Sequence, residues 1–413
     1  MSINPNTSES DLKIGIEVFV EKKLYKKFLN KRIGLLCNQA SVDKNFVPVY
    51  LIFKELFGDK FEVIFSPQHG IFAEKQANMI GSSDEVEPLT GVKVHSLYGP
   101  RLKPESEVLK KLDVVFVDLQ DVGCRVYTFI WTLFLLMKEC EKLKKEVIIF
   151  DRPNPVGDQI EGPILEEEFF SFVGMCKLPL RHGLTIGEIA LYFQKKHFKN
   201  LKIKVVKMEN YNRKYYFCDT GRNWVFTSPN MPTWETALFY PGMVLLEGTN
   251  ISEGRGTTLP FQIFGAPYLK KLHTKKFITD FQEKFENFEV ILRPVVFEPW
   301  FDKWKGKRCY GFQIHLKNFR KFKPVEFALT LLKEFKQNCE EFEFLPPPYE
   351  FEEKLKPIEI LIGNKKVLDW IDNRSKFDLQ DSLYYNLKNY LEEVKDILLY
   401  PQENFEDFSD GAE

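Results

Sequence analysis

The stretch Ser66–Gln76, which reads SPQHGIFAEKQ, places several side chains able to carry or orient a proton in one short loop. It follows an apolar run and contains Gln68, His69 and Glu74. Histidine and glutamate can exchange a proton with a substrate, whereas a glutamine amide can orient a substrate but cannot be a general acid near neutral pH. A turn at Gly70 would bring Glu74 back toward the crevice. The loop is therefore either part of a catalytic site or a turn that His69 merely caps.

Other polar loops also follow short apolar runs, among them CNQAS, LYGPRLKP, DLQDVGCRVYT and DRPNPVG. In an open α/β sheet the carboxyl ends of the strands share one edge, where ligand crevices form. Two long stretches downstream, TSPNMPTWETALFYPG and LLEGTNISEGRGTTLPF, read as loops of a length that in compact proteins is usually either functional or disordered, and their apolar residues argue against disorder. The catalytic candidates on all these loops are Glu74, Gln68, His69 and Tyr127, and the substrate-binding candidates are Asn38, Asp118, Asp121, Arg125, Arg152, Asn154, Asn230, Glu247, Asn250, Glu253 and Arg255.

Several of these residues also have a purely structural interpretation. Asp118 and Asp121 could cap the following helix or hold Arg125 in place. The ring of Tyr127 is expected to pack against its apolar neighbours while its hydroxyl lies at the start of a helix, facing the crevice. The prolines of DRPNP stiffen a turn, and the glycines of EGRG could form only a backbone anion nest.

Apolar runs alternate with amphipathic stretches from Lys31 to about Met208, a pattern typical of a parallel sheet with helices on both faces. The expected strands are 32–38, 61–67, 92–99, 113–119, 146–152 and 202–208, and the expected helices are 47–58, 104–112, 127–143 and 185–197. Later, strands 288–300 and 308–317 precede helices 324–338 and 379–398. The predicted fold class is α/β, with a Rossmann-like, doubly wound, mostly parallel sheet domain (12–238), a smaller α+β C-terminal domain (239–402) and an acidic tail (403–413).

The composition excludes several classes of partner. The chain has 58 basic and 59 acidic residues and a formal net charge of −1, so no global field exists to hold nucleic acid or an anionic membrane. Its 7 cysteines are scattered without a C-x-x-C pair, which indicates a reducing compartment. The N-terminus lacks the features of a secretory signal, and no apolar run reaches the roughly 18 residues needed to span a bilayer. We expect a cytoplasmic protein, whose oligomeric state has no signal in the sequence.

The motifs of several common chemistries are missing. The chain contains no G-x-G-x-x-G after a strand, no G-x-x-x-x-G-K-[ST], no G-x-S-x-G and no H-E-x-x-H. Its 6 histidines are dispersed, so we expect neither a metal nor a cofactor. Carboxylates, histidines, arginines and tyrosines remain, and this set suits acid/base chemistry on a polar, neutral or anionic substrate.

In order along the chain, the motifs GLLCNQAS, SPQHGIF, DLQDVGCRVYT, DRPNPVG, LPLRHGLTIGE, SPNMPT and EGTNISEGRGTTLPF resemble the NamZ-type exo-β-N-acetylmuramidase family. The stretch RPVVFEPWFDKWKGKRCYGFQIHL is similar to the second domain of that family, so the resemblance covers nearly the whole chain from about Gly15. It implies a cleft between the two domains. It also implies hydrolysis of terminal, non-reducing N-acetylmuramic acid from peptidoglycan fragments, with a small muropeptide or amino sugar as the expected partner.

The resemblance adds Arg181 and His182 to the substrate-binding candidates. It also suggests a role for the arginines, because N-acetylmuramic acid carries a lactyl carboxylate that a guanidinium binds bidentately. Arg125, Arg152 and Arg181 are the residues expected to bind it.

The usual family motif is P-E-H-G, whose glutamate is the expected acid/base, and the corresponding residue here is Gln68. Loss of a general acid typically lowers the rate about 10²–10⁴-fold. We expect Glu74 to take the role of the acid, with Glu247 and Glu253 next in line. Two alternatives stay open: a non-catalytic sugar-binding relative, and a hydrolase of another amino-sugar glycoside. The choice between a retaining and an inverting mechanism depends on the separation of the carboxylates.

Overall fold

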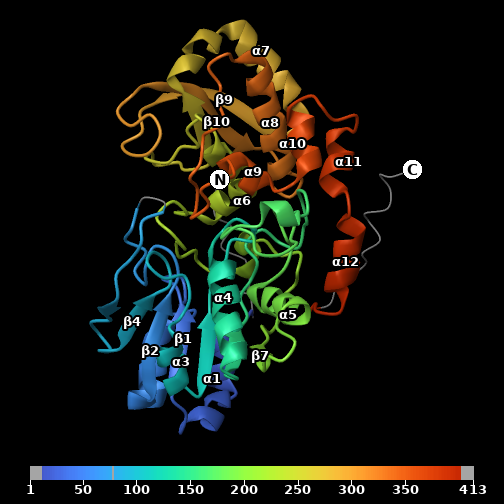
Figure 1. Ribbon diagram of the computed structural model, residues 1–413. Coiled ribbons are helices and arrows are strands. Elements are labelled where there is room, and N and C mark those ends of the chain that lie inside the picture. Colours follow the sequence, from blue (N-terminus) through green and yellow to red (C-terminus); the bar gives the residue numbers. More distant parts are fainter. Residues whose placement is uncertain (1–11, 77–78, 401–413) are drawn as a thin grey trace.

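The computed structural model describes residues 12–76 and 79–400, and its larger part is built on a seven-stranded sheet (Figure 1). The strands lie in the order β3-β4-β2-β1-β5-β6-β7. Their bounds are β1 Ile33–Cys37, β2 Phe61–Ser66, β3 Glu85–Val86, β4 Lys93–Ser96, β5 Val114–Asp118, β6 Glu146–Phe150 and β7 Ile203–Val206. All neighbours pair in parallel except the short edge strand β3. The six parallel strands have the order of a Rossmann fold, as predicted, with the switch point between β1 and β5.

Helices cover both faces of this sheet, which explains why its strands are continuously apolar. On one face Leu35 and Phe116 pack against α1 (Gly15–Glu21) and α2 (Val49–Phe57). On the other face Leu36 and Val117 pack against α3 (Ser106–Lys111), α4 (Phe129–Lys142) and α5 (Ile186–Lys196). Successive strand residues point to opposite faces, so adjacent leucines serve two different cores.

The second part contains an antiparallel sheet in the order β8-β10-β9, formed by β8 Ile263–Ala266, β9 Val290–Phe297 and β10 Cys309–Leu316. Its helices are α6 Trp234–Met243, α7 Lys275–Lys284, α8 Pro324–Asn338, α9 Pro357–Ile362, α10 Lys365–Ile371, α11 Leu379–Tyr384 and α12 Leu387–Lys395. The strands and helix expected at 288–300, 308–317 and 324–338 are confirmed. The single helix expected over 379–398 is wrong, because Asn386 adopts a left-handed conformation (φ 65°) that separates α11 from α12.

The two parts share one hydrophobic core, which runs from the face of the large sheet that α3, α4 and α5 cover to α8 and α12. At the join, α6 approaches the start of α8 so closely that a Cβ on Gly242 would lie 1.8 Å from the carbonyl oxygen of Pro324. The chain then returns to the first part, where the Tyr390 hydroxyl donates to the carbonyl of His182 at 2.8 Å. Figure 1 shows α12 beside α5. The boundary at 238/239 stays a prediction, and the acidic tail 403–413 lies outside the described residues.

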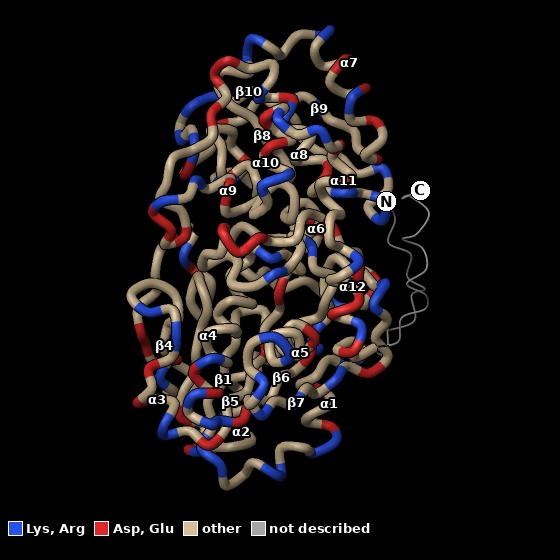
Figure 2. The backbone as a smooth tube through the Cα atoms, turned by 45° about the vertical axis from the view of Figure 1, so that its right-hand side comes forward, with Lys and Arg blue, Asp and Glu red and all other residues tan. Residues whose placement is uncertain are grey.

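Charged residues of both signs are interspersed over both parts (Figure 2), as the near-zero net charge leads one to expect. Across residues 12–76 and 79–400, no helix has the length and apolar character required to cross a membrane.

Gly242→Ala should lower the free energy of unfolding by more than about 3 kcal/mol, because the new methyl group would meet backbone atoms that cannot move aside. Denaturant unfolding would measure the loss. Gly306→Ala is the matched control: nothing lies within 4 Å of its Cβ position, and its left-handed φ of 67° should cost only roughly 1 kcal/mol. Equal losses in the two variants would contradict the close contact between α6 and α8.

Candidate active site

A small cavity lies where the two parts meet, and loops from both line it. The loop after β2 contributes Gln68 and His69, and the segment that leads into α4 contributes Tyr127 and Thr128. The other lining residues are Val126, Ser228, Asn230, Met231, Tyr240, Arg255, Phe261, Tyr349 and Glu350. The cavity measures about 20 Å³, which is room for one water molecule.

Glu350 is the carboxylate of this cavity, and it is only 3% exposed. Its Oε2 accepts a hydrogen bond from the Tyr98 hydroxyl at 2.7 Å, and its Oε1 lies 3.5 Å from Nε2 of Gln68. The Gln68 amide is oriented in turn, because its Oε1 accepts from the Thr128 hydroxyl at 2.6 Å. Burial raises the pKa of Glu350 to about 7, against the lowering effect of the Tyr98 hydrogen bond. Glu350 is therefore a carboxylic acid that can hold its proton near neutral pH.

The backbone around Glu350 is strained. Glu350 and Phe351 have φ values of 45° and 68°, in the left-handed region that costs a side chain-bearing residue roughly 1–2 kcal/mol. His69 across the cavity has a φ of 74°. Such residues persist only where the surrounding structure holds them, and they concentrate at functional sites.

His69 is neutral in this environment. Its Nδ1 lies 2.8 Å from the carbonyl oxygen of Lys75, a partner that can only accept, so Nδ1 carries the hydrogen and Nε2 is an acceptor. Burial lowers the pKa of the imidazole to about 4. The cavity thus combines a carboxylic acid with a neutral base.

Arg255 is the cation of the cavity. Its Nε and Nη2 donate to one oxygen of Glu247 at 3.2 and 2.7 Å, and Glu253 lies 3.3 Å from its Nε. Burial alone would lower the pKa of Arg255, but the two carboxylates raise it above its usual value. The Tyr349 hydroxyl donates to the other oxygen of Glu247 at 2.7 Å, which links the cluster to the loop of Glu350.

Comparison with known proteins gives this site its context. Residues 33–235 match the family model for the N-terminal part of exo-β-N-acetylmuramidase NamZ, and residues 238–400 match the model for its C-terminal part. The chain belongs to the NamZ family. Peptidoglycan β-N-acetylmuramidase NamZ of Bacillus subtilis (strain 168) is 40% identical over 351 residues, which cover 83% of this chain and 82% of that protein. The resemblance inferred from the motifs, and with it the assignment as a glycoside hydrolase, is confirmed.

Two solved structures of DUF1343 family proteins from Bacteroides fragilis share this two-part fold. They match with TM-scores of 0.82 and 0.73 at 30% and 27% identity. Each comparison covers 95% of this chain and 100% of the other.

Glu74, the acid predicted from the sequence of this NamZ family member, is not among the residues that line the small cavity. Glu74 has a side chain 48% exposed, pairs with Lys75 at 3.3 Å and does not line the cavity. Glu350, which the sequence analysis missed, is 282 residues from Gln68 in a loop without a recognised catalytic motif. The run of three prolines before Tyr349 and Glu350 was the one available signal, since it marks a stiff turn.

The three arginines expected to bind the lactyl carboxylate are buried and bonded within the fold. Arg125 donates to the carbonyls of Pro163, Leu178, Leu361 and Ile362 at 2.7–3.3 Å. None of these three arginines lines the cavity of Glu350.

Arg152 and Arg181 complete that set. Arg152 forms a buried ion pair with Asp118 and donates to the carbonyl of Val42 at 2.9 Å. Arg181 donates to the carbonyl of Val156 and to Oε1 of Gln159. Both residues therefore brace loops at the edge of the sheet.

Other predicted binding residues are likewise bonded within loops. Asn38 accepts from the Ser41 hydroxyl at 2.9 Å, and Asn154 donates to the carbonyl of Leu184 at 3.1 Å. Asn250 donates to the carbonyl of Glu341 at 2.7 Å.

Asp121 and His182 lie 3.6 Å apart, away from the cavity lining. Asp121 accepts from the Gly123 amide at 2.7 Å, and Nδ1 of His182 accepts from the Leu184 amide at 3.2 Å. Of the predicted residues, the structure brings Gln68, His69, Tyr127, Asn230 and Arg255 together around the cavity, with Glu247 and Glu253 bonded to Arg255.

Arg125→Lys should lower the free energy of unfolding by about 3 kcal/mol or more, because a lysine cannot reach four carbonyls and those left unbonded are buried. The protein that remains folded should keep the KM of the wild type. Denaturant unfolding and steady-state kinetics measure the two effects separately. A raised KM with unchanged stability would restore the predicted role in substrate binding.

Proposed function

We propose that this chain is an exo-β-N-acetylmuramidase that releases terminal, non-reducing N-acetylmuramic acid from peptidoglycan fragments, with Glu350 as its general acid. The observation that carries the proposal is the buried Glu350 carboxyl, with its pKa raised to about 7, next to Gln68 and His69 of the loop after β2. The printed name of the Bacillus subtilis relative supports the choice of substrate.

In the proposed reaction Glu350 gives its proton to the glycosidic oxygen as the bond from that oxygen to the anomeric carbon breaks. The departing sugar leaves with a neutral hydroxyl. The Tyr98 hydroxyl and the Gln68 amide, which bond to the two oxygens of Glu350, stabilise the carboxylate that results. Gln68 thus orients the acid instead of being the acid.

The attacking water requires a base, and His69 is placed to be one. Water adds to the anomeric carbon while one of its protons passes to Nε2 of His69, the nitrogen left free by the bond between Nδ1 and Lys75. Exchange with solvent then returns the proton from His69 to Glu350. With a pKa of about 4, His69 has the basicity of an ordinary carboxylate, the usual base in glycosidases.

Arg255 is the proposed partner of the lactyl carboxylate, because among the described residues it is the arginine that lines the cavity. A cavity of about 20 Å³ cannot hold a sugar ring, so substrate binding requires the loops around it to separate. The alternative of a non-catalytic sugar-binding relative was based on Gln68, which cannot be a general acid. In this proposal Glu350 supplies the acid that Gln68 cannot.

Glu350→Gln should lower kcat about 10²–10⁴-fold while binding of the sugar persists, because the amide keeps the shape of the side chain but cannot give up a proton. Release of a chromogenic leaving group from an N-acetylmuramide measures the rate. Glu74→Gln is the matched control and should leave kcat close to the wild-type value. If instead Glu74→Gln abolished turnover and Glu350→Gln did not, the acid would be Glu74.

The pH profile provides an independent test. Since Glu350 must be protonated, kcat/KM should fall as pH rises through about 7. Gln68→Glu places a second carboxyl beside it, and two carboxyls that share a proton lose the last one at a higher pH. The basic limb of the profile should therefore move to higher pH in Gln68→Glu, and by less in Gln68→Met, which only removes the amide hydrogen bond that lowers the pKa of Glu350. A limb unchanged in Gln68→Glu would exclude Glu350 as the acid.

A further inference from the structure

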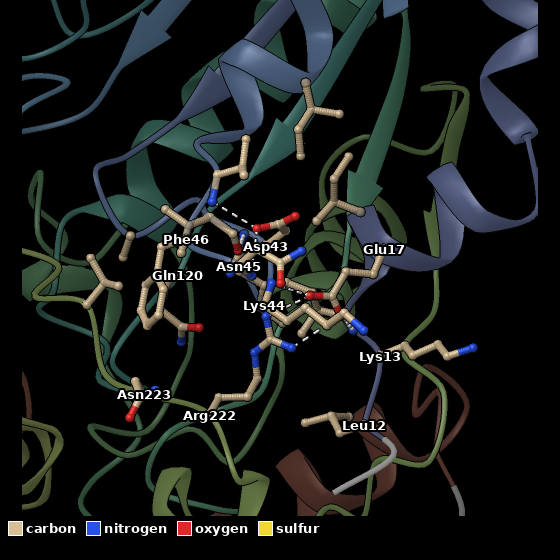
Figure 3. A pocket seen from close by; sticks show the side chains of 18 of the residues that line it. Leu12, Lys13, Glu17, Asp43, Lys44, Asn45, Phe46, Gln120, Arg222 and Asn223 are labelled. Atoms are coloured by element: carbon tan, nitrogen blue, oxygen red, sulfur yellow. Dashed lines mark hydrogen bonds and ion pairs between the residues drawn. The ribbon is translucent and has the colours of Figure 1, made fainter. Parts of the chain in front are cut away.

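A second, much larger pocket lies at the switch point of the parallel sheet (Figure 3). It measures about 800 Å³ and shares no lining residue with the cavity of Glu350. Ala40 and Val42 line it from the loop after β1, Gln120 from the loop after β5, and Arg152 and Pro153 from the loop after β6. Pockets of this size and position in open α/β sheets are ligand sites.

One partly buried ion pair shapes this pocket. Arg222 donates to both oxygens of Glu17 at 3.2 and 2.8 Å, and Figure 3 shows the two side chains pointing toward each other. Glu17 also accepts from the backbone amides of Ile14 and Lys44 at 3.0 and 2.7 Å. The pair joins α1, the loop after β1 and the segment 221–225. Each oxygen of Glu17 already accepts two hydrogen bonds, so this carboxylate is not a group that would bind a ligand.

Other lining groups keep capacity for a ligand. Within residues 12–76 and 79–400, the side-chain amides of Asn45 and Asn223 and the ammonium of Lys44 have no hydrogen-bond or ion-pair partner, although all three residues line the pocket. Ile52 and Leu56 of α2 supply apolar wall. The pocket therefore offers two uncharged amides, one cation and an apolar surface.

An aromatic side chain stands at the rim. Phe46 lines the pocket yet is 51% exposed, and its φ of 62° is unusual for a bulky residue. The turn that presents it is held by Asp43, whose Oδ1 accepts from the amides of Asn45 and Val47 at 2.8 Å. An exposed aromatic face beside amide groups suits a ligand with one apolar ring face and several hydroxyls.

We propose that this pocket is a second ligand site, which binds an N-acetylated amino sugar carrying one carboxylate. Phe46 packs on the sugar ring, Asn45 and Asn223 bond its hydroxyl and acetamido groups, and Lys44 pairs with its carboxylate. The choice of this sugar rests on the proposed function, since N-acetylmuramic acid is the product of that reaction. A dinucleotide does not fit, because the loop after β1 reads CNQAS and lacks the glycines that allow a pyrophosphate to approach the backbone.

The two sites are physically linked by the segment 221–231. Its beginning lines the larger pocket, and Ser228, Asn230 and Met231 near its end line the cavity of Glu350. Within it, Nε1 of Trp224 in the larger pocket donates to the carbonyl of Met231 at 2.9 Å. A sugar bound in the larger pocket therefore contacts the same segment that borders the catalytic cavity.

Calorimetric titration of the full chain carrying Glu350→Gln tests the site, with N-acetylmuramic acid and N-acetylglucosamine as the two probes. Lys44→Met should weaken the binding of N-acetylmuramic acid about fivefold and leave N-acetylglucosamine unchanged, because only the former carries a carboxylate. Asn223→Leu should weaken both about tenfold or more. Lys199→Met and Asn200→Leu, the same exchanges at exposed positions, are the matched controls and should change neither.

The proposal would be overturned if no binding were detected at millimolar sugar, or if Lys44→Met and Asn223→Leu bound the sugars as tightly as the controls Lys199→Met and Asn200→Leu. Equal affinity of the unsubstituted pocket for the two sugars would refute the role of Lys44. The outcome is distinguishable from a failure of the proposed function, because hydrolysis is measured without these variants. A chain that binds the sugar through Asn223 but hydrolyses no muramide would refute the enzyme and keep the pocket.

Discussion

The cavity of Glu350 depends on the guanidinium of Arg125, which has no carboxylate partner among residues 12–76 and 79–400. Arg125 lies just before α4, and its four hydrogen bonds end on the carbonyls of Pro163 and Leu178 and on those of Leu361 and Ile362 at the end of α9. It thus ties the segment of Tyr127 and Thr128 to the stretch of chain that follows Glu350. Burial lowers the pKa of Arg125 to about 10, which still leaves the group charged at neutral pH. The dipoles of these four carbonyls compensate the charge of Arg125. The carbonyls must therefore stay within hydrogen-bonding distance of the guanidinium, which fixes the loop before α4 relative to the end of α9.

The candidate site is formed by segments that lie far apart in the sequence. Gln68 bonds to Thr128 and approaches Glu350, and the Tyr98 hydroxyl reaches the same carboxyl from the loop after β4. The family resemblance expects a glutamate at position 68, and here the carboxyl stands across the cavity from an amide at that position. A carboxyl and an amide at this spacing keep one titrating proton in the cavity, whereas two carboxyls would share it.

The sequence predicted the fold better than the site. Six parallel strands and their helices could be located because the apolar runs of the strands are buried on both faces, and the alternation of strands and helices indicated a doubly wound sheet. The break at Asn386 could not be predicted, since the amphipathic pattern continues through it while the backbone turns left-handed. In the site, residues of the loop after β2 were identified because a strand end brings them to the crevice. Glu350 was not, because its position depends on a contact between parts of the chain separated by 282 residues. The bonds that Arg125 and His182 make within the fold could not be predicted either, because buried loops use polar groups of any kind to bond their own carbonyls and amides.

The return of the chain end to the first domain has a consequence for biosynthesis. The Tyr400 hydroxyl donates to Asp151 at 2.6 Å, and the backbone amide of Leu399 donates to Glu188 at 2.9 Å, both deep in the larger part. During synthesis Asp151 is made 249 residues before Tyr400, and Glu188 is made 211 residues before Leu399. Both acids have other partners in the larger part: Asp151 accepts from the Thr185 hydroxyl at 2.9 Å and the Gly187 amide at 2.8 Å, and Glu188 pairs with Arg213. Until residues 399 and 400 have been made, each acid lacks one of its hydrogen bonds. A chain that stops before Leu399 therefore lacks two hydrogen bonds that tie its last described segment to the larger part, and two buried carboxylates of the larger part each lose one donor.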